Sequence, residues 1–269
     1  MKNLKIFYIS IIPIISFLYD VNKQVFPNTI LNCNGEIPNK TACLIKASTY
    51  NIDITRIDIC QEDPFPEFRT SADFNNSNCI NLFNSKNLFE KLDLDKALIF
   101  KLSKEKIKDG NYKYISIILK NKFTASGKYD VGKYIYITSS KGPQEILIDK
   151  NTNKNPMKFT EKFSNWRGKA NQPNRYCKNG GTFSRCDLNY NGIKLTAIGI
   201  GRDFIETHGE KTKYLFYLSE FPSPIKIDNS SIGYFEIKAK KNLEVYGNGV
   251  QVKSISIAPF LFRTDYNDS

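Results

Sequence analysis

Six cysteines are the residues whose type and spacing indicate chemistry most clearly in this sequence. Close cysteines form either disulfides or zinc sites, and zinc sites favour pairs about two to four residues apart with histidines nearby. The sequence has no such close pair and a single histidine. The spacing therefore predicts no metal site and three local disulfides: Cys33–Cys43, Cys60–Cys79 and Cys177–Cys186.

A basic and aromatic stretch is the second place where chemistry is expected. Residues 150–185 carry nine basic side chains and one acid, a formal charge of +8 within a chain of net charge +12. Guanidinium groups bind carboxylate or phosphate, and aromatic rings stack on flat ligands and cations. The candidate ligand-binding residues are Trp166, Arg167, Lys169, Arg175, Tyr176 and Arg185. Two interpretations stay open: an anion- or glycan-binding surface, or a long insert that Phe159, Phe163 and Trp166 anchor to the fold.

The sequence predicts no catalytic residues and no cofactor. His208 lies between two glutamates, but no nucleophile motif accompanies it. The glycines at 199 and 201 lack the remainder of a dinucleotide-binding motif. Five acids match no calcium-binding loop and are expected at exposed strand and turn positions: Asp53, Asp58, Glu62, Asp63 and Glu67.

The N-terminus has the residue order of an export signal. Lys2 and Lys5 precede an apolar run at 6–19. Residues 1–20 are predicted to be a signal peptide or, alternatively, an N-terminal anchor. Export places the cysteines in an oxidising compartment, where disulfides form and persist. The expected location is therefore secreted, periplasmic or at the cell surface.

Strands are expected to position these candidate residues. Apolar and polar residues alternate at 50–55 and 98–103, and residues 112–119 are largely apolar or aromatic on both faces, as in a central strand. Further strands are expected at 80–82, 134–138, 145–148, 195–200, 214–219, 232–239, 243–246 and 250–257, with one short helix at 84–94. The predicted fold is all-β: an antiparallel β-sandwich, immunoglobulin-like or transthyretin-like, with long disulfide-closed loops. One domain, 21–269, carries the basic-aromatic insert at about 150–190.

Two segments carry a resemblance to a known family. The runs YNIDITRIDIC at 50–60 and DGNYKYISIIL at 109–119 resemble strands of a family of exported bacterial β-sandwich proteins. Most of those proteins are of unknown function, and many come from marine bacteria with AT-rich genomes. The resemblance covers about two thirds of the chain and implies a cell-surface or periplasmic sandwich with no known active site. Asp109 stands where that family has a small residue, and the chain lacks a lipid-acceptor cysteine.

The lack of a catalytic motif in the sequence favours a binding protein over an enzyme. The expected function is a non-catalytic binding, adhesion or assembly module that contacts an anionic glycan or another cell-surface polymer. Export disfavours nucleic acid as the partner, and exposed strand edges could support self-assembly. The alternative is a secreted polysaccharide-active enzyme on the same scaffold, which would place paired carboxylates in one cleft.

Overall fold

The computed structural model consists of β-strands and loops. It describes residues 32–268 apart from 86–89, 92–97, 103–107, 141, 152–153, 165–167, 170–171, 174–183, 191–192, 229–232, 241 and 259–260. Within these residues the only helical segments are two short 3-10 turns, η3 (Arg202–Phe204) and η4 (Gly209–Lys211). Strand pairing within the described sheets is antiparallel. The all-β antiparallel architecture that the sequence predicted is therefore confirmed.

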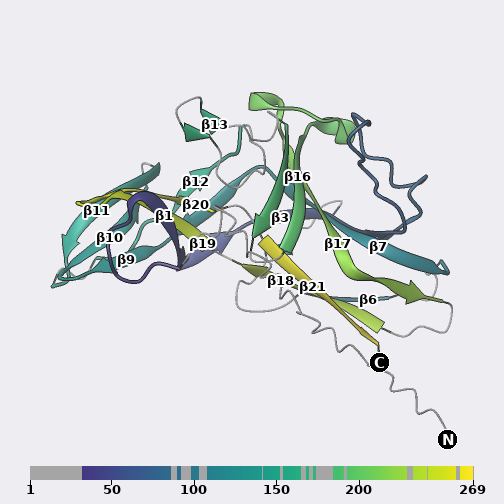
Figure 1. Cartoon of the computed structure of the whole chain (residues 1–269), viewed down its shortest axis with the longest axis horizontal. Helices are drawn as coiled ribbons and strands as arrows, with labels where there is room; N and C mark the ends of the chain where they lie inside the picture. Colours follow the sequence, from purple (N-terminus) through teal and green to yellow (C-terminus); the bar gives the residue numbers. More distant parts are fainter. Residues whose placement is uncertain are drawn as a thin grey trace, which may run out of the picture.

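A seven-stranded sheet forms most of the larger lobe (Figure 1). Its order is β15 (Arg185–Tyr190), β16 (Ile193–Ile200), β17 (Tyr214–Ile227), β7 (Gly110–Lys120), β3 (Asp53–Cys60) and β4 (Cys79–Asn84), and β5 (Glu90–Lys91) pairs with the start of β3. Strand β7 lies between β17 and β3, and its residues 115–119 are buried. A central strand has neighbours on both sides and both faces, which explains its largely apolar sequence.

The two faces of this sheet are covered differently. A second sheet, β21 (Leu261–Asp268), β18 (Gly233–Lys240) and β6 (Leu98–Lys101), packs on one face, which we call the inner face. Phe235 and Phe262 from this second sheet share one core with Ile117 and Tyr217 of the large sheet. Side chains alternate between faces along a strand, so Ile118 and its neighbours form a separate cluster on the opposite, outer face.

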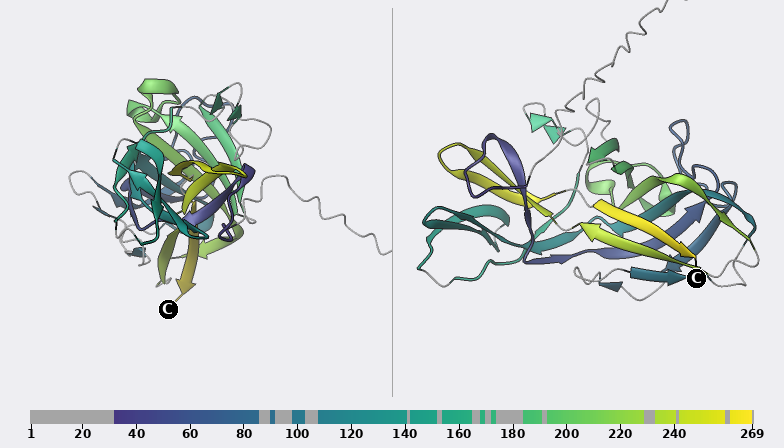
Figure 2. Two further views of the ribbon diagram at one scale, coloured as in Figure 1. Left: turned by 90° about the vertical axis from the view of Figure 1, so that its left-hand side faces the viewer. Right: turned by 60° about the horizontal axis from the view of Figure 1, so that its bottom comes forward.

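A smaller lobe lies beside the larger one (Figures 1 and 2). It contains three short sheets: β1 (Asn39–Lys46), β19 (Asn242–Asn248) and β20 (Val252–Ile257); β9 (Lys128–Val131), β10 (Tyr134–Ser139) and β11 (Gly142–Asp149); and β2 (Thr49–Asn51), β8 (Phe123–Ser126) and β12 (Phe159–Glu161). Tyr129 and Leu243 of this lobe belong to the same buried cluster as Ile117 of the larger lobe. The two lobes therefore share one hydrophobic core.

The first part of the basic-aromatic insert is built into the smaller lobe. Strand β12 pairs with β8, and Phe159 is buried there. Phe163 packs edge-on against Phe123, with 5.4 Å between the ring centroids. The anchoring role proposed for Phe159 and Phe163 is thus confirmed, whereas Trp166 lies outside the described residues. Further along, β13 (Gly168–Lys169) and β14 (Gln172–Pro173) form a small hairpin.

The strands expected from alternation are present where the structure describes them, and the described residues of the expected helix at 84–94 are not helical. The apolar residues that suggested the helix lie outside the described residues: Leu88, Phe89 and Leu92. Within 84–94 the described residues are extended: Asn84 ends β4, and Glu90 pairs with Ile54 of β3. A few apolar residues in a short run satisfy a helical and an extended pattern equally, and here pairing with β3 decides the outcome.

Candidate functional site

Two loops cover the outer face of the seven-stranded sheet. The first, residues 61–78, is called the disulfide loop because Cys60 at the end of β3 is bonded to Cys79 at the start of β4. The second, residues 201–213, connects β16 to β17. Phe65 of the disulfide loop meets Phe216 of the sheet edge-on at 5.5 Å between centroids. In Figure 1 both loops lie above the sheet, and β18 and β21 lie below it.

The cysteines form the bridges that their spacing predicted where the structure describes both partners. These bridges are Cys33–Cys43 and Cys60–Cys79. Cys186 is also disulfide-bonded, and Cys177 lies outside the described residues. Disulfides are typical of proteins in oxidising compartments.

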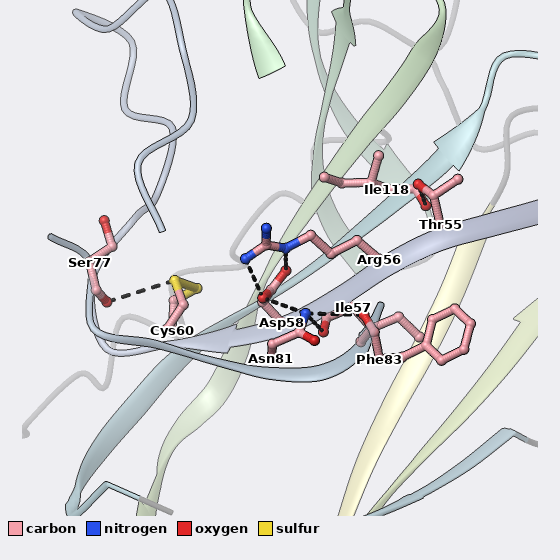
Figure 3. Close-up of polar contacts among 10 residues, drawn as sticks. Thr55, Arg56, Ile57, Asp58, Cys60, Ser77, Asn81, Phe83 and Ile118 are labelled. Carbon is pink, nitrogen blue, oxygen red and sulfur yellow. Dashed lines mark hydrogen bonds and ion pairs between the residues drawn. A yellow bond between two sulfur atoms is a disulfide. The ribbon is translucent and has the colours of Figure 1, made fainter. Parts of the chain in front are cut away.

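A buried ion pair lies beneath the two loops. Arg56 donates to Asp58 through Nε at 2.7 Å and through Nη2 at 2.9 Å, and Asn81 donates to the same carboxylate at 2.9 Å (Figure 3). The Arg56 guanidinium also stacks on Phe74, 3.8 Å from the ring centroid. Burial raises the pKa of Asp58, and the bonds from Arg56 and Asn81 oppose that rise. The expectation of an exposed Asp58 is wrong, because the loops bury it completely.

A groove lined by basic residues opens beside this ion pair. We call it the basic groove; it has a volume of about 680 Å³. Three segments that are far apart in the sequence supply its basic residues: Lys120 and Lys122, Lys162, and Arg202 and Lys213 of the 201–213 loop. Among the residues that the structure describes, Glu210 is the one acid that lines it. Lys162 belongs to the basic-aromatic insert, so the insert contributes to this groove through its described first part.

Asn121 holds these segments together. Its side chain is buried, accepts the Phe163 N–H at 2.8 Å, and donates to the carbonyls of Phe163 at 2.6 Å and Thr212 at 3.1 Å. Its backbone N–H donates to the Lys213 carbonyl at 2.9 Å. One buried amide therefore fixes the end of β7 against both the insert and the 201–213 loop, and a preorganised site loses less entropy when it binds.

The start of the second loop has an unusual backbone. Asp203 and Phe204 have φ angles of 58° and 57°, in the left-handed region that non-glycine residues seldom adopt. The disulfide loop stabilises this conformation, because Ala72 donates to the Phe204 carbonyl at 3.3 Å and Glu206 donates to the Thr70 carbonyl at 2.8 Å. The two covering loops are thus joined, and Arg202 is held where it lines the groove.

A second hollow adjoins the basic groove. We call it the arginine hollow, because Arg56 lines it, and its volume is about 540 Å³. Lys120, Arg202 and Tyr214 line both hollows, so the two share a wall. Each volume falls within the range of about 300–1,000 Å³ that is typical of small-ligand pockets.

Of the site residues predicted from sequence, the structure describes the side chain of Arg185. Trp166, Arg167, Arg175 and Tyr176 lie outside the described residues, as does the side chain of Lys169. Arg185 donates to the Phe65 carbonyl, and its guanidinium lies 5.7 Å from the Phe65 ring. Arg185 therefore contacts the disulfide loop.

The groove residues on β7 and on the 201–213 loop were missed by the sequence analysis. One signal was available: Lys120 and Lys122 flank an asparagine directly after an apolar central strand. A second was the Arg56 and Asp58 pair, which two-residue spacing places on one face of β3. Arg202, Lys213 and Lys122 line one groove only because folding brings distant segments together, and the local sequence around each of them does not indicate this.

Comparisons with models of known protein families, with curated proteins and with solved structures gave no match. Among the residues that the structure describes, no helix is long and apolar enough to span a membrane. The same residues contain no group of three or more histidine, cysteine, aspartate or glutamate side chains placed to hold a metal ion.

Proposed function

We propose that this chain is an exported, non-catalytic binding module that holds anionic groups in the basic groove. The observation that carries the proposal is the convergence of Lys120, Lys122, Lys162, Arg202 and Lys213 around one concave surface. These residues come from separate parts of the chain, so a run of lysines in the sequence does not account for the cluster. A concave surface of one sign of charge concentrates ligands of the opposite sign.

The chemistry of the groove suits carboxylate, sulfate or phosphate groups. Lysine supplies a flexible point charge, whereas the Arg202 guanidinium supplies a planar fork that matches two oxygens of one anion. Phe163 and Tyr214 line the same groove and offer apolar ring surfaces beside the charges. Charged groups with adjacent rings favour an acidic glycan over a bare inorganic ion.

The cellular location supports a surface polymer as the ligand. The disulfides favour an oxidising compartment, and the order of residues at the N-terminus favours export. In that setting an anion-binding module would act in adhesion or in the capture of acidic glycans at the cell surface or in the periplasm.

A matched pair of triple variants tests the proposal. The first variant replaces three exposed groove lysines by alanine: Lys122, Lys162 and Lys213. The second variant replaces three exposed lysines of the smaller lobe by alanine: Lys128, Lys150 and Lys253. Both variants lose the same net charge. Immobilised polygalacturonate is the probe, and affinity is measured over a range of salt concentrations.

The groove variant is expected to lose roughly tenfold in affinity, because each exposed ion pair contributes up to about 1 kcal/mol. Its affinity is also expected to fall less steeply with salt. The smaller-lobe variant is expected to bind as the unaltered protein does. Equal losses in the two variants would show that net charge alone attracts the polymer, and the groove would then not be the site.

A further inference from the structure

The arginine hollow contains a cation whose orientation is fixed before any ligand arrives. Asp58 engages Nε and Nη2 of Arg56, and Phe74 supports the plane of the guanidinium. Asp58 accepts hydrogen bonds from Nε and Nη2 of the guanidinium, and the third nitrogen, Nη1, does not bond to it. The side chain is 21% exposed and lines the hollow. A guanidinium held in this way needs little reordering to accept an anion at its remaining edge.

The remainder of the hollow combines rings with polar groups. Phe204 and Tyr214, both partly buried, line it together with Thr55 and Ser85. Hollows with a few directed polar groups among apolar surfaces are typical of ligand sites. Asp203 is the one acid among the described residues that line it.

The shared wall has a consequence for the length of the ligand. Arg202 lines both hollows, as does Lys120, which is paired with Asp53 at 3.6 Å, so basic side chains continue from one hollow to the other. An isolated anion would fill one hollow only. A chain that carries an anionic group on successive units would occupy both, and the second contact would form at a high effective concentration.

We infer that the ligand is a linear acidic polysaccharide that passes over Arg202 from the basic groove into the arginine hollow, where Arg56 binds a second anionic group. This inference rests on the proposed function and adds the ligand class and a second subsite. A polysaccharide agrees better than single-stranded nucleic acid with a chain whose disulfides and leader favour export.

Two exposed residues allow a test that leaves the core intact. Asn84 lies opposite Arg56 in the pairing of β4 with β3 and lines the arginine hollow. Asn84→Asp adds a negative charge there, and Asn84→Ala is its uncharged control. Asp203→Asn removes the acid, and asparagine tolerates the left-handed backbone at this position. Thermal unfolding confirms that each variant is folded.

Calorimetry with galacturonate oligomers of increasing length gives the readout. Affinity is expected to rise by at least about tenfold from the shortest oligomers to those that fill both hollows, and then to level off. Asn84→Asp is expected to weaken long oligomers several-fold and to leave the shortest unchanged, whereas Asp203→Asn strengthens the long ones. Asn84→Ala is expected to behave as the unaltered protein.

Three results would overturn the inference. The first is an affinity that does not depend on oligomer length, and the second is an Asn84→Asp variant that binds long oligomers normally. The third is equal or tighter binding of an oligothymidylate with the same number of charges, which would identify nucleic acid as the ligand class. The proposed function fails separately, if the Lys122, Lys162 and Lys213 triple variant binds polygalacturonate normally.

Discussion

The inner and outer faces of the seven-stranded sheet are made by alternate residues of the same strands, yet they differ in what covers them. On the inner face a second sheet packs against side chains such as Ile117 and Tyr217, which are fully buried. On the outer face two loops cover a mixture of apolar residues and the Arg56–Asp58 pair. A sheet makes a continuous cover, whereas loops leave hollows between them. The difference shows why the candidate site lies on the outer face.

Neighbouring isoleucines on β7 allow a direct test of this difference. Ile117 points to the inner core, and Ile118 points to the outer cluster, where it lines the arginine hollow. Ile117→Ala is expected to cost about 4 kcal/mol of unfolding free energy, because it leaves a closed cavity. Ile118→Ala is expected to cost about 2 kcal/mol, because a hollow already adjoins it. Urea unfolding measures both, and equal costs would contradict the difference in packing.

The ion pair on the outer face is the next test. Arg56→Met leaves the Asp58 carboxylate buried without its cation, so we expect a loss of about 3 kcal/mol near pH 7. Removal of the guanidinium takes away an influence that lowers the pKa of Asp58, so that pKa rises further. The loss of stability in Arg56→Met is therefore full at pH values above the raised pKa of Asp58, and it shrinks as the pH falls through that pKa.

A double variant is the control for this test. In Arg56→Met/Asp58→Asn no charge is left buried, so most of the stability is expected to return at neutral pH. Urea unfolding at about pH 7 and about pH 4 compares the variants. An equal loss of unfolding free energy at both pH values in Arg56→Met would indicate that the lost packing on Phe74, and not an unpaired charge, causes the loss.

Glu161 in the smaller lobe lies near another acid, Glu244, whereas Asp58 is paired with the cation of Arg56. The Glu161 carboxylate accepts the Ile257 N–H at 2.6 Å, and Glu244 lies close enough to repel its charge. Burial, and then this repulsion, raises its pKa from 4.5 to about 7. The folded protein therefore binds a proton more tightly than the unfolded chain does, and stability falls as the pH rises from 4.5 to about 7.

Glu161→Gln removes this charge and keeps an oxygen that can accept from Ile257. Near pH 8 the variant is expected to be more stable than the unaltered protein by roughly 2–3 kcal/mol, and near pH 4 the two should be equal. Thermal or urea unfolding at both pH values measures the difference. A variant that is less stable near pH 8 would show that the ionised carboxylate contributes to the fold.

Much of the scaffold could be predicted from sequence, because local patterns encode it. Alternation along 50–55 indicated a half-buried strand, and the largely apolar run at 112–119 indicated a central strand. Cysteine spacing indicated the bridges Cys33–Cys43 and Cys60–Cys79. Short edge strands escaped the analysis. Strand β12, for example, has only three residues and is recognisable through its pairing with β8.

The candidate site could not be predicted in the same way, because it is assembled by long-range contacts. The concentration of charge at 150–185 drew attention to the insert, which supplies Lys162 to the groove, although Lys162 was not among the predicted site residues. The other groove lysines looked like ordinary surface residues in a lysine-rich chain. Asn121 was overlooked for a related reason: its role depends on two backbone carbonyls, at Phe163 and Thr212, that are distant in the sequence.

The most direct test of the account is to locate the bound ligand on the protein. Amide chemical shifts, followed by NMR during titration with a long oligogalacturonate, report which backbone groups sense it. If the ligand binds in the two hollows of the outer face, the largest changes are expected at 120–122, 162–164, 201–204 and 209–214. Changes centred on β9, β10 and β11 of the smaller lobe, with the outer face unaffected, would contradict it.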